Sequence, residues 1–193
     1  NWKWEKEKRQ HIVGRATGDW IMTVDSDEVY KEKDLLFVKK IMGENPNILS
    51  IWPTHYRFCG DFWHYYPWLG AVFQRKIKGC ELYGLREMWF PGRKVYKYPW
   101  NICKNVSDEE FKKHVWRTAD RDIICYHYSN VCTAGKAHRK KLISVGLRHN
   151  MVGWDEREFG TGRKLKLFEG EHPDAMKEHP YYKNPPGWLE KKS

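Results

Sequence analysis

Three carboxylates lie within four residues in the segment 25–28 (DSDE), directly after the apolar run 20–24. The run predicts a buried strand, and ligands of open α/β sheets bind at the carboxyl edge of such strands. Like charges this close repel each other, and a hard divalent cation such as Mg²⁺ or Mn²⁺ neutralises them through carboxylate oxygen ligands. The segment therefore predicts a metal site, and a solvated acidic turn that caps a helix beginning near Lys31 is the alternative.

The stretch KRQHIVGRATGDWIMTVDSDEVY, residues 8–30, resembles the central segment of the family 2 glycosyltransferases of the GT-A fold. Members of that family carry a basic residue and helix, then Ala-x-Gly-Asp-Trp/Tyr, an apolar strand and Asp-x-Asp. The matching residues here are Arg9, Ala16, Gly18, Asp19, Trp20, Asp25 and Asp27, and Glu28 matches a DxDE variant. The resemblance implies that Asp25 and Arg9 bind a nucleotide-sugar donor and that Asp27 ligates Mn²⁺ or Mg²⁺.

A second stretch, IICYHYSNVCTAGKAHRKK at residues 123–141, resembles the late strand of the same family, which ends in a metal-binding histidine. His127 is the match, and a neutral imidazole can bind Mn²⁺. A satisfied core histidine is the alternative for His127. The resemblance also implies that Lys136 neutralises the donor diphosphate, together with Arg139 and Lys140, although a solvated helix face explains these three cations equally well.

An inverting glycosyltransferase needs a carboxylate that deprotonates the acceptor hydroxyl. We choose Glu87 as this base, with Glu81 and Asp61 as further candidates. Aromatic rings pack on the C–H faces of sugars, so Trp89 and Trp63, the latter within the aromatic segment 60–68, are predicted to bind the acceptor. An ordinary surface carboxylate and a satellite core cluster are the structural alternatives.

Periodicity and turn residues predict an α/β fold, a GT-A-like mixed sheet flanked by helices. The expected elements are a helix at 2–17, a strand at 20–24, a helix at 33–42, a strand at 48–58, an aromatic loop at 60–68, a strand at 69–76, a capped helix at 107–116, a strand at 121–128 and a helix from 133. We assign residues 1–159 to a catalytic segment and 160–193 to a basic tail that contains Pro and Gly and packs on it. The resemblance covers only the second part of the fold, so we expect upstream polypeptide to complete the nucleotide-binding half.

The 193 residues carry 35 Lys and Arg against 25 Asp and Glu, a net charge of +10, and 16% of them are aromatic. The aromatic content argues against disorder, and the charge favours anionic partners. No apolar run approaches the roughly 20 residues of a membrane helix, and the first ten residues lack the apolar region of a signal peptide. The five cysteines form no CxxC pair, which favours buried free thiols in a reducing, cytoplasmic compartment.

The sequence therefore predicts an inverting, metal-dependent glycosyltransferase that uses a nucleotide diphospho-sugar. The acceptor is open, and a glycan, a lipid-linked sugar or another polyanion would suit the positive charge. A basic nucleic-acid-binding module without catalysis is the alternative, because cations and aromatic rings also serve phosphate contacts and base stacking. A metal-dependent hydrolase is a third interpretation, but the chain carries no HExxH or related spacing.

Overall fold

The computed structural model describes residues 2–82, 88–89, 109, 113–118, 123–131 and 165–183. These residues contain both helices and strands, which confirms the expected mixed α/β content. The chain divides into two compact units. Unit 1 comprises Asn1–Asp25, Glu32–Thr54 and Leu69–Ile123, and unit 2 comprises Ser26–Lys31, His55–Trp68 and Ile124–Ser193.

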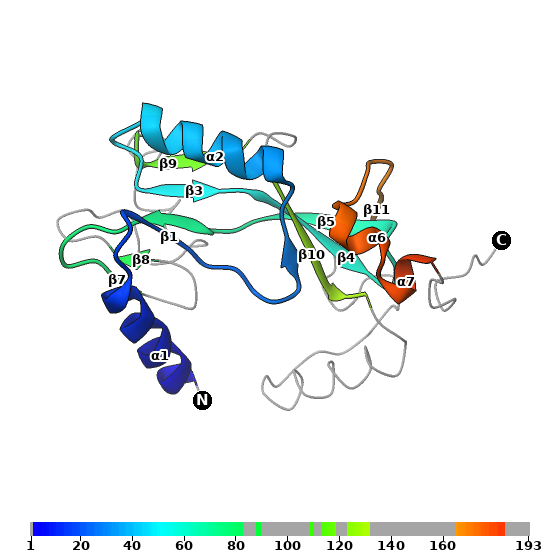
Figure 1. Ribbon diagram of the computed structural model, residues 1–193, viewed down its shortest axis with the longest axis horizontal. Helices are drawn as coiled ribbons and strands as arrows, with labels where there is room; N and C mark the ends of the chain where they lie inside the picture. The colour runs from blue at the N-terminus through cyan, green and yellow to red at the C-terminus, as the bar shows by residue number, and fades with distance from the viewer. Residues whose placement is uncertain are drawn as a thin grey trace. The chain divides into compact units, whose positions relative to one another are not determined.

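Unit 1 is built on a mixed sheet with the strand order β1-β6-β3-β9. Its described elements are α1 (Trp2–Arg15), β1 (Trp20–Met22), α2 (Glu32–Glu44), β3 (Ser50–Trp52), β6 (Phe73–Arg75), β7 (Glu81–Leu82), β8 (Met88–Trp89) and β9 (Val115–Arg117). The pairs β1/β6 and β3/β6 are antiparallel, whereas β3 and β9 are parallel. β7 and β8 form a separate antiparallel pair, and α1 contacts β7 (Figure 1).

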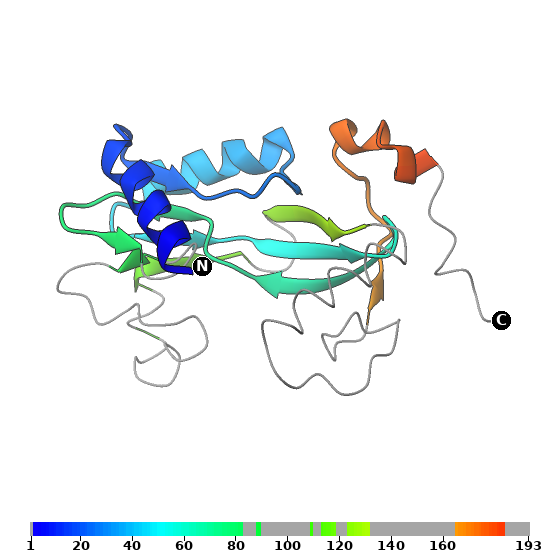
Figure 2. The ribbon, with the colours of Figure 1, turned by 90° about the horizontal axis from the view of Figure 1, so that it is seen from below.

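The hydrophobic core of unit 1 contains side chains from the helix α1, from the strands β3 and β9, and from loops. Its buried members are Val13, Leu49, Trp52, Ala71, Cys80 and Val115. In the first helix Val13 is buried, whereas its neighbour Ile12 is 59% exposed. α2 runs beside the strands of this unit in both views (Figures 1 and 2). It buries Val38 and Ile41, which lie three positions apart on one helical face.

Unit 2 is built on a second sheet, with the strand order β11-β5-β4-β10-β2. Its described elements are β2 (Glu28–Val29), β4 (Thr54–Cys59), β5 (His64–Leu69), β10 (Ile124–Asn130), β11 (Lys166–Leu167), α6 (Asp174–Lys177) and α7 (Pro180–Lys183). The pairs β10/β2 and β11/β5 are antiparallel. β2 is therefore an edge strand that lies beside β10 (Figure 1).

Alternation along the strands gives the sheet of unit 2 two different faces. One face carries rings that pack into an aromatic core, and Phe58 stacks on Tyr128 with ring centroids 5.0 Å apart. The buried members of this core are Phe58, Phe62, Tyr126, Tyr128, Val131 and Phe168. The intervening positions of β4 and β10 carry polar and sulfur-containing residues instead. These are His55, Arg57, Cys59, Cys125 and His127.

Several sequence expectations for the strands need correction. The single strand expected at 48–58 is split into β3 and β4 at Pro53, which has no backbone N–H for a sheet hydrogen bond. Residues 60–68 are not all loop, because β5 begins at His64 and pairs with β11. The strand expected to be buried at 20–24 lies at a sheet edge, which leaves Met22 and Val24 exposed.

The helix expected at 107–116 is also too long. Residues 109, 113 and 114 are helical, but Val115–Arg117 form β9, whose parallel pairing with β3 overrides the local helix propensity. The helix expected from Thr133 lies outside the described residues. In the part of the chain that the structure describes, no helix combines the length and apolar character needed to cross a bilayer. Cys59, Cys80 and Cys125 are buried free thiols, as expected.

Candidate metal centre

Backbone pairing between two strands brings the acidic segment to His127. β2 and β10 are antiparallel, and Glu28 lies directly opposite His127 in their register. The Tyr128 backbone N–H donates a hydrogen bond of 2.9 Å to the Asp27 carbonyl oxygen, which extends this pairing by one residue. Directly opposed residues project on the same face of a sheet. The register therefore brings the side chains of Glu28 and His127 together.

The His127 imidazole lies between two carboxylates. Its Nε2 is 3.5 Å from Asp27 Oδ1, and its Nδ1 is 3.5 Å from Glu28 Oε1. The exposed fractions of the side chains are 39% for Asp27, 6% for His127 and 0% for Glu28. The cluster thus passes from an accessible carboxylate through a nearly buried ring to a fully buried carboxylate.

The two ring nitrogens of His127 face different carboxylates. In the tautomer with its proton on Nδ1, the N–H faces the buried Glu28 carboxylate and the lone pair of Nε2 faces Asp27. Metal-binding histidines commonly direct their second ring nitrogen at a carboxylate, which fixes the tautomer and the ring orientation. Asp27 and His127 can therefore hold one divalent ion, and Glu28 can orient the ring of His127.

Two further residues with metal-ligating side chains lie on the same sheet. His55 Nδ1 is 3.6 Å from Glu28 Oε1, and ligand atoms of Glu28, His55 and Cys125 all lie within 4.8 Å of one another. Sequence reasoning missed His55 and Cys125. The available signal was the position of Cys125 two residues before His127, since alternate strand residues share a face. His55 carries no such signal, because only the pairing of distant strands brings β4 to this cluster.

Two predicted donor-binding residues of unit 1 contact each other. Arg9 Nη2 is 3.5 Å from Asp25 Oδ1, with 24% and 40% of the two side chains exposed. The guanidinium offsets the charge of the carboxylate that the sequence identified as the first of the Asp-x-Asp pair. Lys136, the third residue predicted to bind the donor, lies outside the described residues.

The predicted base and acceptor residues are described only in part. Glu87 lies outside the described residues, immediately before β8. β8 contains Trp89, which pairs with Glu81 across β7 and β8. Asp61, a further base candidate, has its Oδ1 engaged as the acceptor of the Trp63 and His64 backbone N–H groups at 2.8 and 2.7 Å.

Trp63 packs beside the aromatic core of unit 2. Its ring centroid is 5.4 Å from that of His172 and 5.7 Å from that of Tyr182. The residue is half-buried. The core-cluster interpretation thus explains part of the position of Trp63, and its predicted contact with an acceptor sugar stays a prediction.

Comparison with protein-family models, with curated proteins and with solved structures finds no match to this chain. The resemblance to family 2 glycosyltransferases accordingly stays a prediction that rests on the motif residues of 8–30 and 123–141.

Proposed function

We propose that this protein is a metal-dependent glycosyltransferase that moves a sugar from a nucleotide diphospho-sugar to an acceptor hydroxyl. The observation that carries the proposal is the 3.5 Å approach of His127 Nε2 to Asp27 Oδ1. These two residues lie about 100 positions apart in the sequence. The family resemblance assigns both of them to one metal ion, and a chance match of two short motifs gives no reason for them to meet.

The donor set suits Mn²⁺ or Mg²⁺. Neighbouring ligand atoms of an octahedral ion with bonds of about 2.1 Å lie roughly 3 Å apart. His127 Nε2 and Asp27 Oδ1, which are 3.5 Å apart, would therefore move only slightly closer to bind such an ion. Carboxylate oxygen suits both ions, and imidazole nitrogen shifts the preference towards Mn²⁺. When bound, such an ion neutralises the diphosphate and polarises its oxygens as a Lewis acid. The chain itself supplies the accessible Asp27 carboxylate and a His127 ring that Glu28 holds in orientation.

The remaining roles in the proposal come from the resemblance. Asp25, Arg9 and Lys136 bind the donor, Glu87 deprotonates the acceptor hydroxyl, and Trp63 and Trp89 bind the acceptor sugar. In this proposal the elements that the structure describes belong to the second part of a GT-A-like fold. The inverting course follows from direct attack of the deprotonated hydroxyl on the anomeric carbon, with departure of the nucleotide diphosphate.

The first experiment measures Mn²⁺ binding directly by the electron paramagnetic resonance signal of the free ion. We expect Asp27→Asn and His127→Gln each to weaken binding at least about tenfold, because the first removes the negative charge of one ligand and the second removes the imidazole nitrogen. Glu44→Gln and His11→Gln are matched controls at exposed positions of the helices α2 and α1, and both should bind as the wild type does. Equal Mn²⁺ affinity in all five proteins would refute the metal assignment.

The second experiment tests the reaction. The full chain is incubated with UDP-, GDP- or dTDP-sugars, with Mn²⁺ or with EDTA, and release of the nucleoside diphosphate is followed. We expect one donor class to be consumed only with the metal, and Asp27→Asn to abolish that activity. Consumption of no donor, combined with salt-sensitive binding of oligonucleotides, would instead favour the nucleic-acid-binding alternative.

A further inference from the structure

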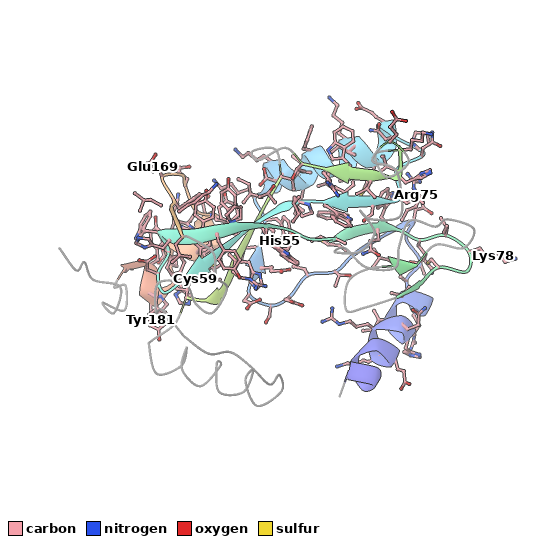
Figure 3. The ribbon with its side chains drawn as sticks, turned by 180° about the vertical axis from the view of Figure 1, so that it is seen from behind. His55, Cys59, Arg75, Lys78, Glu169 and Tyr181 are labelled. Carbon is pink, nitrogen blue, oxygen red and sulfur yellow. The ribbon has the colours of Figure 1, made fainter. Side chains whose placement is uncertain are left out.

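We infer that unit 2 contains a second metal site, a buried Zn²⁺ site whose ligands are Glu28, His55 and Cys125. These residues come from three strands, β2, β4 and β10, and β10 lies between the other two in the sheet. Figure 3 shows His55 on β4, with Cys59 further along the same strand. The site differs from the Asp27 and His127 pair in its residues and its burial, and it does not depend on sugar transfer.

Strand alternation explains why these side chains meet. Cys125 and His127 are two positions apart on β10 and share a face, while Tyr126 and Tyr128 point into the aromatic core on the other face. Glu28 lies directly opposite His127 in the register of β2 and β10. His55 likewise alternates with Tyr56, which packs against the aromatic core. One face of the sheet therefore carries the metal-ligating side chains.

The distances fit a tetrahedral ion. Bonds of about 2.0 to 2.3 Å to oxygen, nitrogen and sulfur place the ligand atoms roughly 3.3 to 3.6 Å apart. Glu28 Oε1 and His55 Nδ1 are already 3.6 Å apart, and all three ligand atoms lie within 4.8 Å of one another. Closure on an ion thus requires movements of about 1 Å or less in side chains whose strands are already paired.

Burial and chemistry together select the ion. His55 and Cys125 are completely buried, and so is the side chain of Glu28. A divalent cation would stabilise the buried carboxylate and would take the Cys125 thiolate as a further ligand. Thiolate and imidazole favour Zn²⁺ over Mg²⁺, whereas the oxygen-rich and accessible Asp27 suits the harder ions. Unit 2 thus offers separate donor sets for a soft and a hard cation.

His127 connects the two sites. Its Nδ1 lies 3.5 Å from Glu28 Oε1, the same oxygen that lies 3.6 Å from His55 Nδ1. In the proposed site Glu28, His55 and Cys125 bind the ion and a water fills the fourth position. An ion bound at Glu28 would fix this carboxylate and therefore the His127 ring beside Asp27.

The test uses Co²⁺ as a spectroscopic probe for the Zn²⁺ site in the full chain. Metal-free, reduced protein is titrated with Co²⁺, and we expect one equivalent to give thiolate-to-cobalt charge transfer in the near ultraviolet and intense tetrahedral bands in the visible. Zn²⁺ should then displace the Co²⁺ and abolish these bands. A titration that yields only the weak visible bands of octahedral Co²⁺ would overturn the proposal.

Matched variants locate the site. Cys125→Ser should lose the charge-transfer band, and His55→Gln should weaken Co²⁺ binding at least about tenfold. Cys59→Ser removes another buried free thiol from the same sheet and should retain the full spectrum. Asp27→Asn should also retain it, so failure of this site can be distinguished from failure of the proposed transferase site. A Cys125→Ser variant with an unchanged spectrum would refute the assignment.

The near-ultraviolet circular dichroism of the aromatic residues shows whether each ligand variant folds. If a variant does not fold, a measurement on the wild-type protein still tests the site. X-ray absorption at the zinc edge of Zn²⁺-loaded protein should show one sulfur at about 2.3 Å and nitrogen or oxygen at about 2.0 Å. A coordination shell of oxygen and nitrogen alone would exclude Cys125 as a ligand and overturn the proposal.

Discussion

His172 should make the stability of this protein depend on pH. The residue is 2% exposed, and its ring centroid lies 4.7 Å from that of Phe168 and 4.8 Å from that of Phe58. Its Nδ1 lies 2.8 Å from the Tyr128 hydroxyl. Burial lowers the pKa of His172 from 6.5 to about 4, the backbone of Phe62 opposes this shift, and the positive charge of Lys31 contributes to it.

The direction of the effect follows from proton linkage. Between pH 6.5 and about 4, the unfolded chain binds a proton at His172 that the folded chain does not bind, so stability falls as the pH falls. Linkage with these two pKa values predicts a loss of about 2 kcal/mol between pH 7 and pH 5. Local opening that admits water reduces this value, and we therefore expect a loss of about 1 to 2 kcal/mol from this residue.

Urea unfolding in the presence of EDTA at pH 7 and pH 5 measures the effect. His172→Asn keeps a polar atom near the Tyr128 hydroxyl but removes the titration, and it should lose about 1 to 2 kcal/mol less than the wild type between the two pH values. The void left by the smaller side chain lowers stability at both values and cancels in this difference. His11→Asn, at an exposed position, should follow the wild type. Equal losses in the wild type and His172→Asn would refute the reasoning.

Substitutions at three other positions test a hydrogen bond, a tight contact and a helix, each by the midpoint of urea unfolding. Thr118→Val removes the hydroxyl that accepts a hydrogen bond of 3.1 Å from the Thr54 backbone N–H, and it should cost about 1 kcal/mol, whereas Thr118→Ser should keep most of the stability. Gly170→Ala should cost about 1 to 3 kcal/mol, because the new Cβ would lie 2.8 Å from a ring atom of Phe168, a member of the aromatic core. Gly43→Ala should instead stabilise α2 by about 0.5 to 1 kcal/mol, since its Cβ meets nothing within 4 Å. An unchanged midpoint in Thr118→Val, or a stabilised Gly170→Ala, would contradict the respective argument.

Local sequence signals predicted the elements well where those signals were strong. The spacing of apolar residues predicted α2 within two residues at each end, and the run of β-branched and aromatic residues predicted the β3 and β4 region. The signals failed where pairing with distant strands decides the conformation. Val115–Arg117 became a strand through β3, and His64–Leu69 became a strand beside β4 and β11.

The same contrast applies to the candidate site, where motifs indicated some residues and the pairing of distant strands determines the others. The family resemblance implied that Asp27 and His127 bind one metal ion, and the two side chains lie 3.5 Å apart. The burial of Glu28 and its position between two histidines were not predictable, because they depend on the antiparallel register of β2 and β10. His55 belongs to a strand that the sequence does not connect to either motif.

The alternation along β10 makes the stability of the fold and the chemistry of the site separable by experiment. Tyr126 and Tyr128 pack in the aromatic core, whereas Cys125 and His127 project towards Glu28 on the opposite face. Substitutions on the aromatic face should therefore change the unfolding free energy through lost ring packing, while those on the ligand face should change metal affinity. Because both faces belong to one strand, a change in its register would reverse them and disrupt both at once. The pairing of Glu28 with His127 is thus the feature on which the core and the proposed metal sites jointly depend.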